Sequence, residues 1–567
     1  MENEGNALIW YSRGMEEQIK EIVQKELAKL GADSVSFAVE WPADMAHGDY
    51  AVNAAMAASK ALGKSPRDIA EALLPAIVEG LGEDAASVEI AGPGFINITL
   101  SGRAVSARLA SAREESWGRN LDQDAKRVMV EYTDPNPFKE MHIGHLMSNV
   151  VGESVARLTE YAGAHVMRAN FQGDVGPHVA KALWALRKKG ITDPESAKEI
   201  GDAYAHGSHS YDESPEAKSE IDLINTALYE GEDRELMELW RKGRDVSLSA
   251  FEDLYRILGT KFEYYFFESE TAAEGTRIVR EHVGTVFTES DGAIIYEGEK
   301  KGLHTLVFIT SRGTPTYEAK DIGLAFAKEE VWPSDTSIIL TAAEQIGHFK
   351  VMLAALEDIA PTLAHKTVHV PHGFLRLSTG KMSSRDGNVV TAVSLLHDVV
   401  VTTLTRNEDP IVAGEVALGA IKYSILKQSA GSDIIFDFDK SLSLEGDSGP
   451  YLQYALVRAR SIVERAGQEG QTKCDTIDEG ASAATPYVLS RLITRFPEVI
   501  RKAQTLRAPH VVVQYLTQLA SEWNSFYANE RIIGEADEAY KLGIANAFIQ
   551  TMENGLWVLG IPAPERM

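Results

Sequence analysis

The segment 136–145 combines two histidines and a glycine at spacings that suit phosphate binding. His142 and His145 lie three residues apart, so on a helix both imidazoles project from one turn and can donate to phosphate oxygens. Gly144 has no Cβ and allows a nucleotide to approach the backbone closely. A metal-binding pair, or a helix start with incidental histidines, would contain the same residues. The position between an expected strand and an expected helix favours phosphate, because helix N-termini attract anions.

A second polar segment follows the last strand expected in the same sheet. It reads Lys381-Met382-Ser383-Ser384-Arg385-Asp386-Gly387-Asn388. Two cations and two hydroxyls beside a glycine suit a triphosphate whose charge must be neutralised during reaction. Taken alone, the pattern is equally typical of a polar surface loop.

Together and in this order, the two segments resemble the HIGH and KMSKS signatures of class I aminoacyl-tRNA synthetases. The surrounding residues are similar to those of the arginyl-tRNA synthetases in particular. Further similar segments are 48–50, 92–95, 173–176, 316–321, 447–454 and 457–460. The resemblance spans nearly the whole chain and is weakest in an acidic stretch at about 191–290.

The resemblance implies an enzyme that activates L-arginine with ATP and Mg²⁺ to arginyl-adenylate. The arginyl group would then pass to the 3′-terminal adenosine of tRNA(Arg), releasing AMP and pyrophosphate. Because the attacking carboxylate is already ionised, alignment and charge neutralisation should carry the rate. The resemblance also implies that the first step can require bound tRNA.

The expected catalytic residues follow from the same resemblance, with one departure. Ser384 stands where the KMSKS pattern has its second lysine, and Lys139, just before the histidines, is the candidate to replace it. This sequence also lacks the proline that the family pattern has after Lys139, and Glu140 occupies that position. The catalytic set is Lys139, His142, His145 and Lys381, and the ATP-binding set is Gly144, His142, His145, Met382, Ser383, Ser384 and Arg385.

A guanidinium is planar, permanently charged and best held by carboxylates. Asp321 lies four residues after Tyr317, so both could line one wall of a pocket from a single helix. By resemblance, the arginine-binding residues are Glu131, Asn136, Tyr317, Asp321 and Gln345. Without the resemblance, Asp321 would be interpreted as an acid on a helix surface.

The elements that must position these residues alternate between strand and helix. Strands are expected at 128–132, 166–171, 338–341 and 368–374, with helices at 142–161 and 349–359. This alternation predicts an α/β fold with a doubly wound, Rossmann-like parallel sheet that binds ligands at the strands' carboxyl ends.

Three domains are expected around that sheet. Residues 1–112 form an α+β domain with helices at 15–30, 50–62 and 66–78. Residues 113–440 form the catalytic domain, with a helical, acidic insertion at about 191–290. Residues 441–567 form an all-α bundle that includes a helix at 486–506. The resemblance makes the first domain a tRNA contact and the last one the anticodon-binding domain.

The net charge of −27 argues against a simple nucleic-acid coat protein. A local basic bias occurs at 491–510, where five basic residues face one acid, although a solvated helix face would look the same. Bases of single-stranded loops stack on aromatic rings and arginine planes, although most aromatic rings of such a bundle belong to its core. The expected tRNA-binding residues are Tyr454, Arg458, Arg501, Arg507 and Trp523.

The composition of the whole chain limits the remaining possibilities for its compartment and function. The single cysteine, Cys474, precludes an internal disulfide, and no apolar stretch reaches the ~20 residues of a membrane span. We therefore expect a cytoplasmic, monomeric protein without a dedicated metal site. The rival interpretations are a related class I enzyme with another amino acid, or a noncatalytic RNA-binding paralogue. Tyr317 and Asp321 argue against the first, and the intact His142, His145 and Lys381 against the second.

Overall fold

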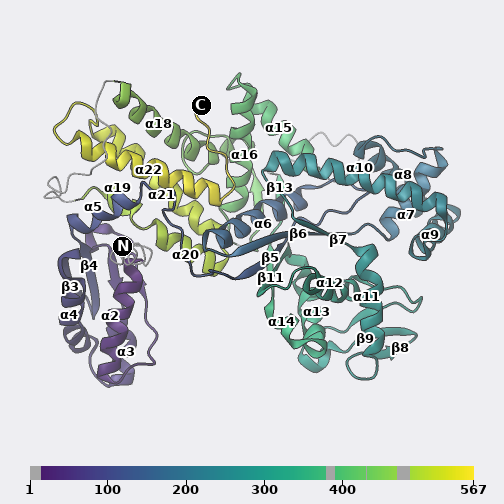
Figure 1. The fold of residues 1–567 in the computed structure, drawn as a ribbon, viewed down its shortest axis with the longest axis horizontal. Coiled ribbons are helices and arrows are strands. Elements are labelled where there is room, and N and C mark those ends of the chain that lie inside the picture. Colours follow the sequence, from purple (N-terminus) through teal and green to yellow (C-terminus); the bar gives the residue numbers. More distant parts are fainter. Residues whose placement is uncertain (1–13, 378–389, 430, 469–485) are drawn as a thin grey trace.

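The computed structural model describes residues 14–377, 390–429, 431–468 and 486–567. Figure 1 shows an elongated molecule with the central sheet in the middle. The N-terminal domain and the C-terminal bundle lie at one end, and helices α8–α10 lie at the other. The predicted fold class, a Rossmann-like parallel sheet with an α+β domain and a helical bundle, is confirmed.

The N-terminal domain is a four-stranded antiparallel sheet, in the order β1-β2-β4-β3, covered by helices. Its elements are α2 (Met15–Leu30), β1 (Val39–Glu40), β2 (Tyr50–Val52), α3 (Ala54–Leu62), α4 (Pro66–Leu81), β3 (Ala85–Ala91), β4 (Phe95–Leu100) and α5 (Gly102–Ser111). The helix expected at 50–62 begins only at Ala54, because Tyr50 and Val52 are buried against β4 as part of the sheet.

The central sheet has five parallel strands in the order β12-β11-β5-β6-β7. They are β5 (Arg127–Glu131), β6 (His165–Gln172), β7 (Tyr264–Phe267), β11 (Thr336–Ala342) and β12 (Thr367–His372). The strand order reverses between β5 and β11. Doubly wound sheets bind ligands in the crevice at such a switch point, beyond the strands' carboxyl ends.

Helices cover both faces of this sheet and extend away from it (Figure 1). They are α6 (Ile143–Tyr161), α7 (Pro177–Lys188), α8 (Ala197–Glu213), α9 (Pro215–Glu230), α10 (Arg234–Leu258), α11 (Glu268–Glu281), α12 (Tyr317–Val331), α13 (Ile346–Ile359) and α14 (Pro361–Lys366). A small antiparallel sheet comprises β8 (Thr288–Ser290), β9 (Ala293–Tyr296) and β10 (Leu306–Ile309).

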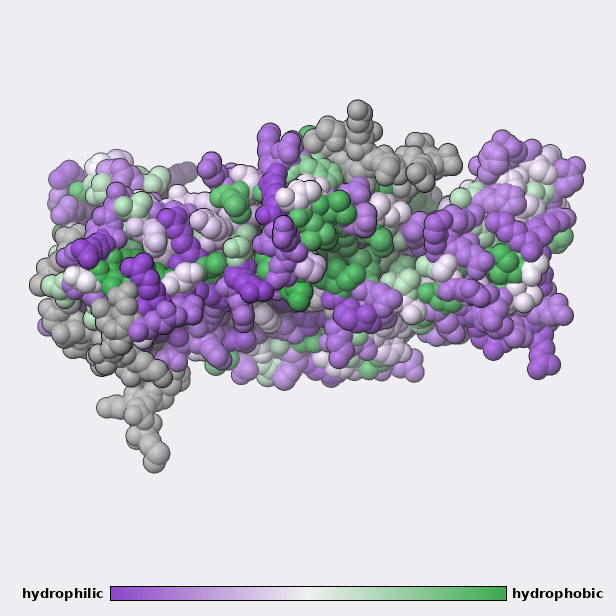
Figure 2. Space-filling view, turned by 90° about the horizontal axis from the view of Figure 1, so that it is seen from above, coloured by the Kyte–Doolittle hydropathy of each residue, from purple (hydrophilic) through white to green (hydrophobic). Residues whose placement is uncertain are grey.

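The range expected for a helical insertion, 191–290, contains the helices α8–α10 and α11, but it is not helical throughout. β7, inside that range, pairs with β6 and is the edge strand of the central sheet. The acidic composition of the range obscured the four-residue aromatic strand at 264–267, whose residues favour the β conformation. In Figure 2 the end of the molecule formed by α8–α10, at the right, is mostly hydrophilic. Apolar residues gather near the middle of the face seen from above.

The C-terminal part begins beside the sheet and ends as a bundle. Its elements are β13 (Leu375–Leu377), α15 (Ala392–Leu404), α16 (Pro410–Leu426), β14 (Ile434–Phe436), α17 (Phe438–Ser441), α18 (Gly449–Gln468), α19 (Val488–Ile493), α20 (Phe496–Leu506), α21 (Pro509–Asn529) and α22 (Glu538–Val558). The single helix expected at 486–506 is two helices, because Pro497 has no N–H and starts α20 afresh. In the part of the chain that the structure describes, no helix combines the length and apolar character needed to cross a membrane.

Candidate active site

The loop between β5 and α6 fixes the two histidines. Thr133, Asp134 and Phe138 have φ values of 78°, 46° and 68°, which non-glycine residues rarely adopt. The loop is held in this shape by neighbouring elements. The N–H of Thr133 donates to Ser148 of α6 at 2.9 Å, and the N–H of Phe138 donates to Ser247 of α10 at 3.1 Å. Strain of this kind is typical of functional loops that the surrounding structure over-determines.

His142 and His145 form a stacked pair at the start of α6. Their ring centroids are 3.7 Å apart. The N–H of Gly144 donates to His142 Nδ1 at 3.1 Å, and the N–H of His142 donates to His145 Nδ1 at 3.2 Å. A Cβ on Gly144 would lie 2.9 Å from the His142 ring, so the glycine also makes room for this imidazole.

Both rings are neutral and have one tautomer. Burial and the charge of Lys139 lower the pKa of His142. Burial, followed by the neighbouring His142 and Lys139, lowers the pKa of His145 well below its usual value. Because each Nδ1 accepts a backbone N–H, each neutral ring carries its proton on Nε2. The pair therefore presents two N–H donors without adding positive charge.

Lys139 lies on the same loop and contacts the helical insertion. Its Nζ is 4.8 Å from the ring centroid of Tyr204 on α8. The preceding residue, Phe138, is buried against α10, where a Cβ on Gly243 would collide with its ring. The insertion thus supports the loop from two helices.

Asn136 lies beside the strand that follows α6. A Cβ on Gly173 would collide with Asn136 Oδ1 and lie 3.2 Å from Glu268 Oε1. Glu268 is buried and its Oε2 accepts from Lys320 of α12 at 2.5 Å. The carboxyl ends of β5, β6 and β7 therefore bring an amide and a carboxylate together.

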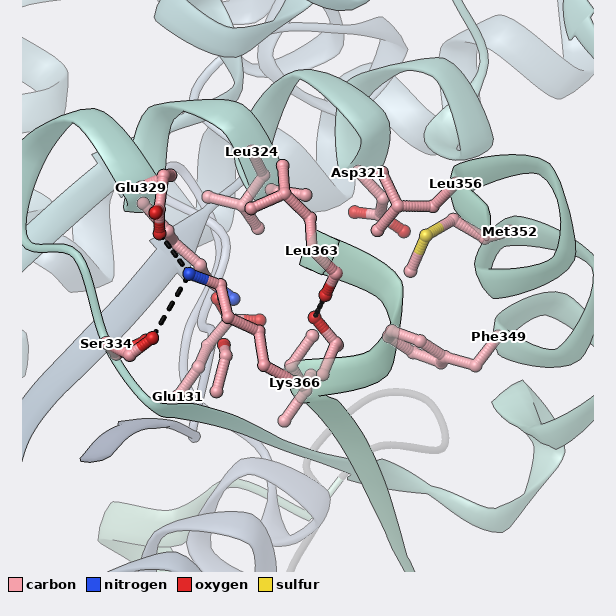
Figure 3. Close-up of a pocket in the computed structure, with 15 residues that line it drawn as sticks. Glu131, Asp321, Leu324, Glu329, Ser334, Phe349, Met352, Leu356, Leu363 and Lys366 are labelled. Carbon is pink, nitrogen blue, oxygen red and sulfur yellow. Dashed lines mark hydrogen bonds and ion pairs between the residues drawn. The ribbon is translucent and has the colours of Figure 1, made fainter. Parts of the chain in front are cut away.

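Two further acids lie along the buried side of α12 (Figure 3). Lys328 Nζ is 2.5 Å from Glu131 Oε2, and burial raises the pKa of Glu131 although Lys328 opposes this. Asp321 Oδ2 is 2.6 Å from His348 Nε2. Glu131 and Asp321 border the same cavity between α12 and α13, with Phe349 opposite them.

The remaining predicted arginine contacts are more open. Tyr317 begins α12 and is 66% exposed. Gln345 ends a short 3-10 helix, Ala343–Gln345, after β11 and is also exposed. Both lie at the carboxyl edge of the sheet, but neither belongs to the buried cluster around Glu131 and Asp321.

The second expected motif, with Lys381, Met382, Ser383, Ser384 and Arg385, lies outside the described residues. The chain that follows it is anchored to the histidine segment. Ile143 donates to the carbonyl of Val390 at 3.1 Å, and Ala392 donates to that of Met141 at 2.8 Å. Residues 390–392 therefore lie next to the start of α6.

The expected tRNA-binding residues separate into two groups. Tyr454 is 37% exposed, and the guanidinium of Arg458 lies 4.1 Å from the ring centroid of Tyr527. Arg507 ends α20 with a φ of 50°. These three are placed on the outside of the bundle or at its helix ends.

The other two residues correct the expectation. Trp523 is fully buried and stacks on Phe548 with centroids 4.6 Å apart, so it belongs to the bundle core. Arg501 is largely buried and pairs with Asp122 at 2.9 Å. In the same basic stretch, Arg491 pairs with Asp49 of the N-terminal domain at 2.6 Å. Much of the basic bias at 491–510 therefore holds domains together.

Four charged partners in the site were not predicted from the sequence: Glu268, Lys320, Lys328 and His348. Lys328 lies seven residues after Asp321 on the same helix, so helical periodicity places both on one face of α12. Lys320 is adjacent to Asp321 in sequence and therefore points to a different side, toward Glu268. His348 and Glu268 reach the site from other elements, and no local pattern identifies them.

A Rossmann-like sheet whose first strand leads into a histidine pair at a helix start, beside buried acids at the switch point, defines a class I aminoacyl-tRNA synthetase. Three family models match the chain. Residues 105–438 match the class I (R) tRNA synthetase catalytic domain, 17–100 the arginyl tRNA synthetase N-terminal domain, and 452–567 the DALR anticodon binding domain. The chain belongs to the arginyl-tRNA synthetase family, and is thus an arginine–tRNA ligase that uses ATP.

Individual relatives are similar to this chain over most of its length. It is 31% identical to an arginine–tRNA ligase of Treponema denticola, across 80% of this chain and 81% of that one. It is 30% identical to an arginine–tRNA ligase of Ectopseudomonas mendocina, across 98% and 100%. The structure of Thermus thermophilus arginyl-tRNA synthetase superposes with a TM-score of 0.82 at 27% identity, covering 98% of this chain and 100% of that one.

Proposed function

We propose that the chain charges tRNA(Arg) in two steps, at the crevice between the carboxyl ends of β5 and β11. The neutral, stacked pair of His142 and His145 is the main support for the roles proposed for individual residues. Its Nε2–H donors lie at the switch point of the sheet. Two fixed donors at a helix start suit the phosphates of ATP.

In the first step, the arginine carboxylate attacks the α-phosphorus of ATP, and the bond to pyrophosphate breaks so that pyrophosphate leaves. Mg²⁺ bound to ATP would neutralise charge on the phosphates. His142 and His145 donate to the phosphates. Lys139, only 4.8 Å from the Tyr204 ring, is free of carboxylate partners in the described contacts and supplies positive charge. Lys381 and the segment Met382–Arg385 complete this set from the chain that precedes residues 390–392. Gly144 leaves space at the start of α6.

Arginine is bound at the face formed by α12. Asp321 accepts from the guanidinium, and Tyr317, one helical turn earlier, covers it. Asn136 holds the α-amino or carboxylate end of the substrate, with Glu131 behind it. Gln345, in the short 3-10 helix after β11, closes the site. The two acids Glu318 and Asp321 on one face of α12 support a cationic substrate at this position.

In the second step, the terminal adenosine of tRNA(Arg) attacks the adenylate. The outward-facing Tyr454, Arg458 and Arg507 contact the tRNA from the bundle, and the N-terminal domain adds a second contact. The cytoplasm is the proposed compartment, where a lone cysteine needs no disulfide partner.

The test is ATP–pyrophosphate exchange with each amino acid, run with and without total tRNA. Of all the amino acids, only arginine should support exchange. Asp321→Asn should raise the KM for arginine by roughly tenfold to hundredfold, because a charged hydrogen bond is lost. Asp253→Asn, an exposed acid on α10, is the matched control. An unchanged KM in Asp321→Asn would remove Asp321 from the pocket, and absence of exchange by folded protein under both conditions would overturn the catalytic roles.

A further inference from the structure

His348, near the start of α13, bridges two carboxylates of α12. Its Nε2 lies 2.6 Å from Asp321 Oδ2, and its Nδ1 lies 3.3 Å from Glu318 Oε1. All three side chains are about 15% exposed. Because both ring nitrogens face oxygen acceptors, the ring satisfies this geometry as an imidazolium with a proton on each nitrogen.

The surroundings of His348 agree with a charged ring. Burial alone would lower the pKa of His348, but the hydrogen bonds to Asp321 and Glu318 and the charges of these two acids raise it to about 10. On β12, burial and the charge of His348 lower the pKa of His369 to about 4. The His369 ring stacks on Phe349, next to His348, and remains neutral.

Some of the charged groups near α12 form one-to-one ion pairs, whereas one cluster contains an extra negative charge. Glu131 is paired with Lys328, and Glu268 is paired with Lys320, so each of these pairs is neutral. The cluster of Asp321, Glu318 and His348 contains two carboxylates and one imidazolium, which leaves one negative charge. The unmatched charge lies where the guanidinium of the substrate is proposed to bind.

We propose that His348 is a positioning residue that determines how arginine is recognised. It holds Asp321 by Oδ2 and Glu318 by one oxygen, so that Asp321 Oδ1 is available to the guanidinium. It also sets the cluster to a single negative charge, which one guanidinium neutralises. This inference rests on the proposed place of Asp321 in the arginine pocket.

Removal of His348 has a specific electrostatic consequence. Two largely buried carboxylates without a cation between them repel each other, and one of them takes up a proton as the pH falls. The protonated carboxyl is a poorer acceptor for a guanidinium. Arginine binding should then depend on pH in a range where the intact imidazolium does not titrate.

The experiment measures KM and kcat for arginine in pyrophosphate exchange with His348→Ala and His348→Gln, across a range from about pH 8 to about pH 6. In His348→Ala we expect the KM for arginine to rise about tenfold at the upper end and further as the pH falls, with kcat within about threefold of the wild type. His348→Gln should recover part of the KM, since its amide N–H can donate to Asp321, but should keep the pH dependence because the amide is neutral.

His365→Gln is the matched control, because His365 is an exposed histidine on α14. The wild type and this control should show a KM that is nearly constant over the same range. A KM in His348→Ala that equals the wild-type value, or that rises by the same factor at every pH together with a lower Tm, would overturn the proposal. If His348→Ala does not fold, the pH profile of His348→Gln decides alone.

Asp321→Asn, assayed in parallel, separates the two possible failures. If Asp321→Asn leaves the KM unchanged, arginine binds elsewhere and the proposed pocket is wrong. If Asp321→Asn raises the KM while both His348 variants match the wild type at every pH, the pocket stands and the role of His348 is wrong.

Discussion

At the scale of single residues, His142 has two tasks that depend on different ring nitrogens. Nδ1 accepts the N–H of Gly144 and caps α6, and Nε2 carries the proton that faces the proposed phosphate site. One imidazole therefore orders the helix start and supplies a donor there. An asparagine can replace the capping acceptor but cannot reach the position of Nε2.

We predict that His142→Asn keeps the stability of the protein and loses activity. The rate of pyrophosphate exchange should fall about a hundredfold, as for the removal of one fixed transition-state donor. His142→Ala should show the same loss and also lower the free energy of unfolding by about 1 kcal/mol, because the cap is gone. Exchange rates and thermal melting of both variants check this, and equal melting of the two variants would contradict the capping role.

At the scale of elements, α8 packs closely on α7 and contacts the catalytic loop. A Cβ on Gly207 of α8 would collide with the backbone carbonyl of Lys181 on α7. This approach places Tyr204 over Lys139, and Gly201 beside Glu140. The helical insertion is therefore a support for the loop that precedes the histidines.

We predict that Gly207→Ala destabilises the protein by about 1–3 kcal/mol, since the added methyl forces the two helices apart. Exchange should also slow, because Tyr204 moves away from Lys139. Gly414→Ala, in the second turn of α16 where a Cβ would meet no atom within 4 Å, is the control and should be neutral or slightly stabilising. Thermal melting compares the two, and equal Tm values would contradict the close-packing argument.

At the scale of the whole molecule, buried polar groups join segments that are far apart in sequence. Glu498 of α20 accepts from the N–H of Glu16, from Trp41 and from Tyr50 of the N-terminal domain. Lys422 of α16 donates to the carbonyls of Leu258, at the end of α10, and Gly560, after the last helix. Catalytic domain, bundle and N-terminal domain are thereby fixed to one another.

We predict a pH-dependent contribution of Lys422 to stability. Burial and the charge of Arg157 lower its pKa from 10.5 to about 7. Between these values the unfolded chain binds a proton that the folded chain does not, so stability rises with pH, by up to about 1.4 kcal/mol per unit. The Tm of the wild type should therefore rise relative to that of Lys422→Met from about pH 7 to about pH 10. If the Tm of the two proteins changed with pH in parallel, Lys422 would be charged in the folded protein, contrary to this prediction.

The sequence alone determined the family, the parallel sheet and the positions of the local signatures. Local signatures are predictable because their residues lie close together along the chain. His142, Gly144 and His145 occupy one helical turn, and Tyr317 and Asp321 occupy another. Hydrophobic strands and helices that alternate regularly fix a doubly wound sheet in the same local way.

Tertiary structure alone decided which charges meet. His348 and Asp321 are neighbours across two helices. Glu268 reaches the site from the start of α11, directly after the edge strand β7, which composition had assigned to a helical insertion. Likewise, Trp523 is in the core and Arg501 lies at a domain junction, although both were expected to contact tRNA. Burial and ion pairing depend on contacts between residues distant in sequence, and no local pattern encodes those contacts.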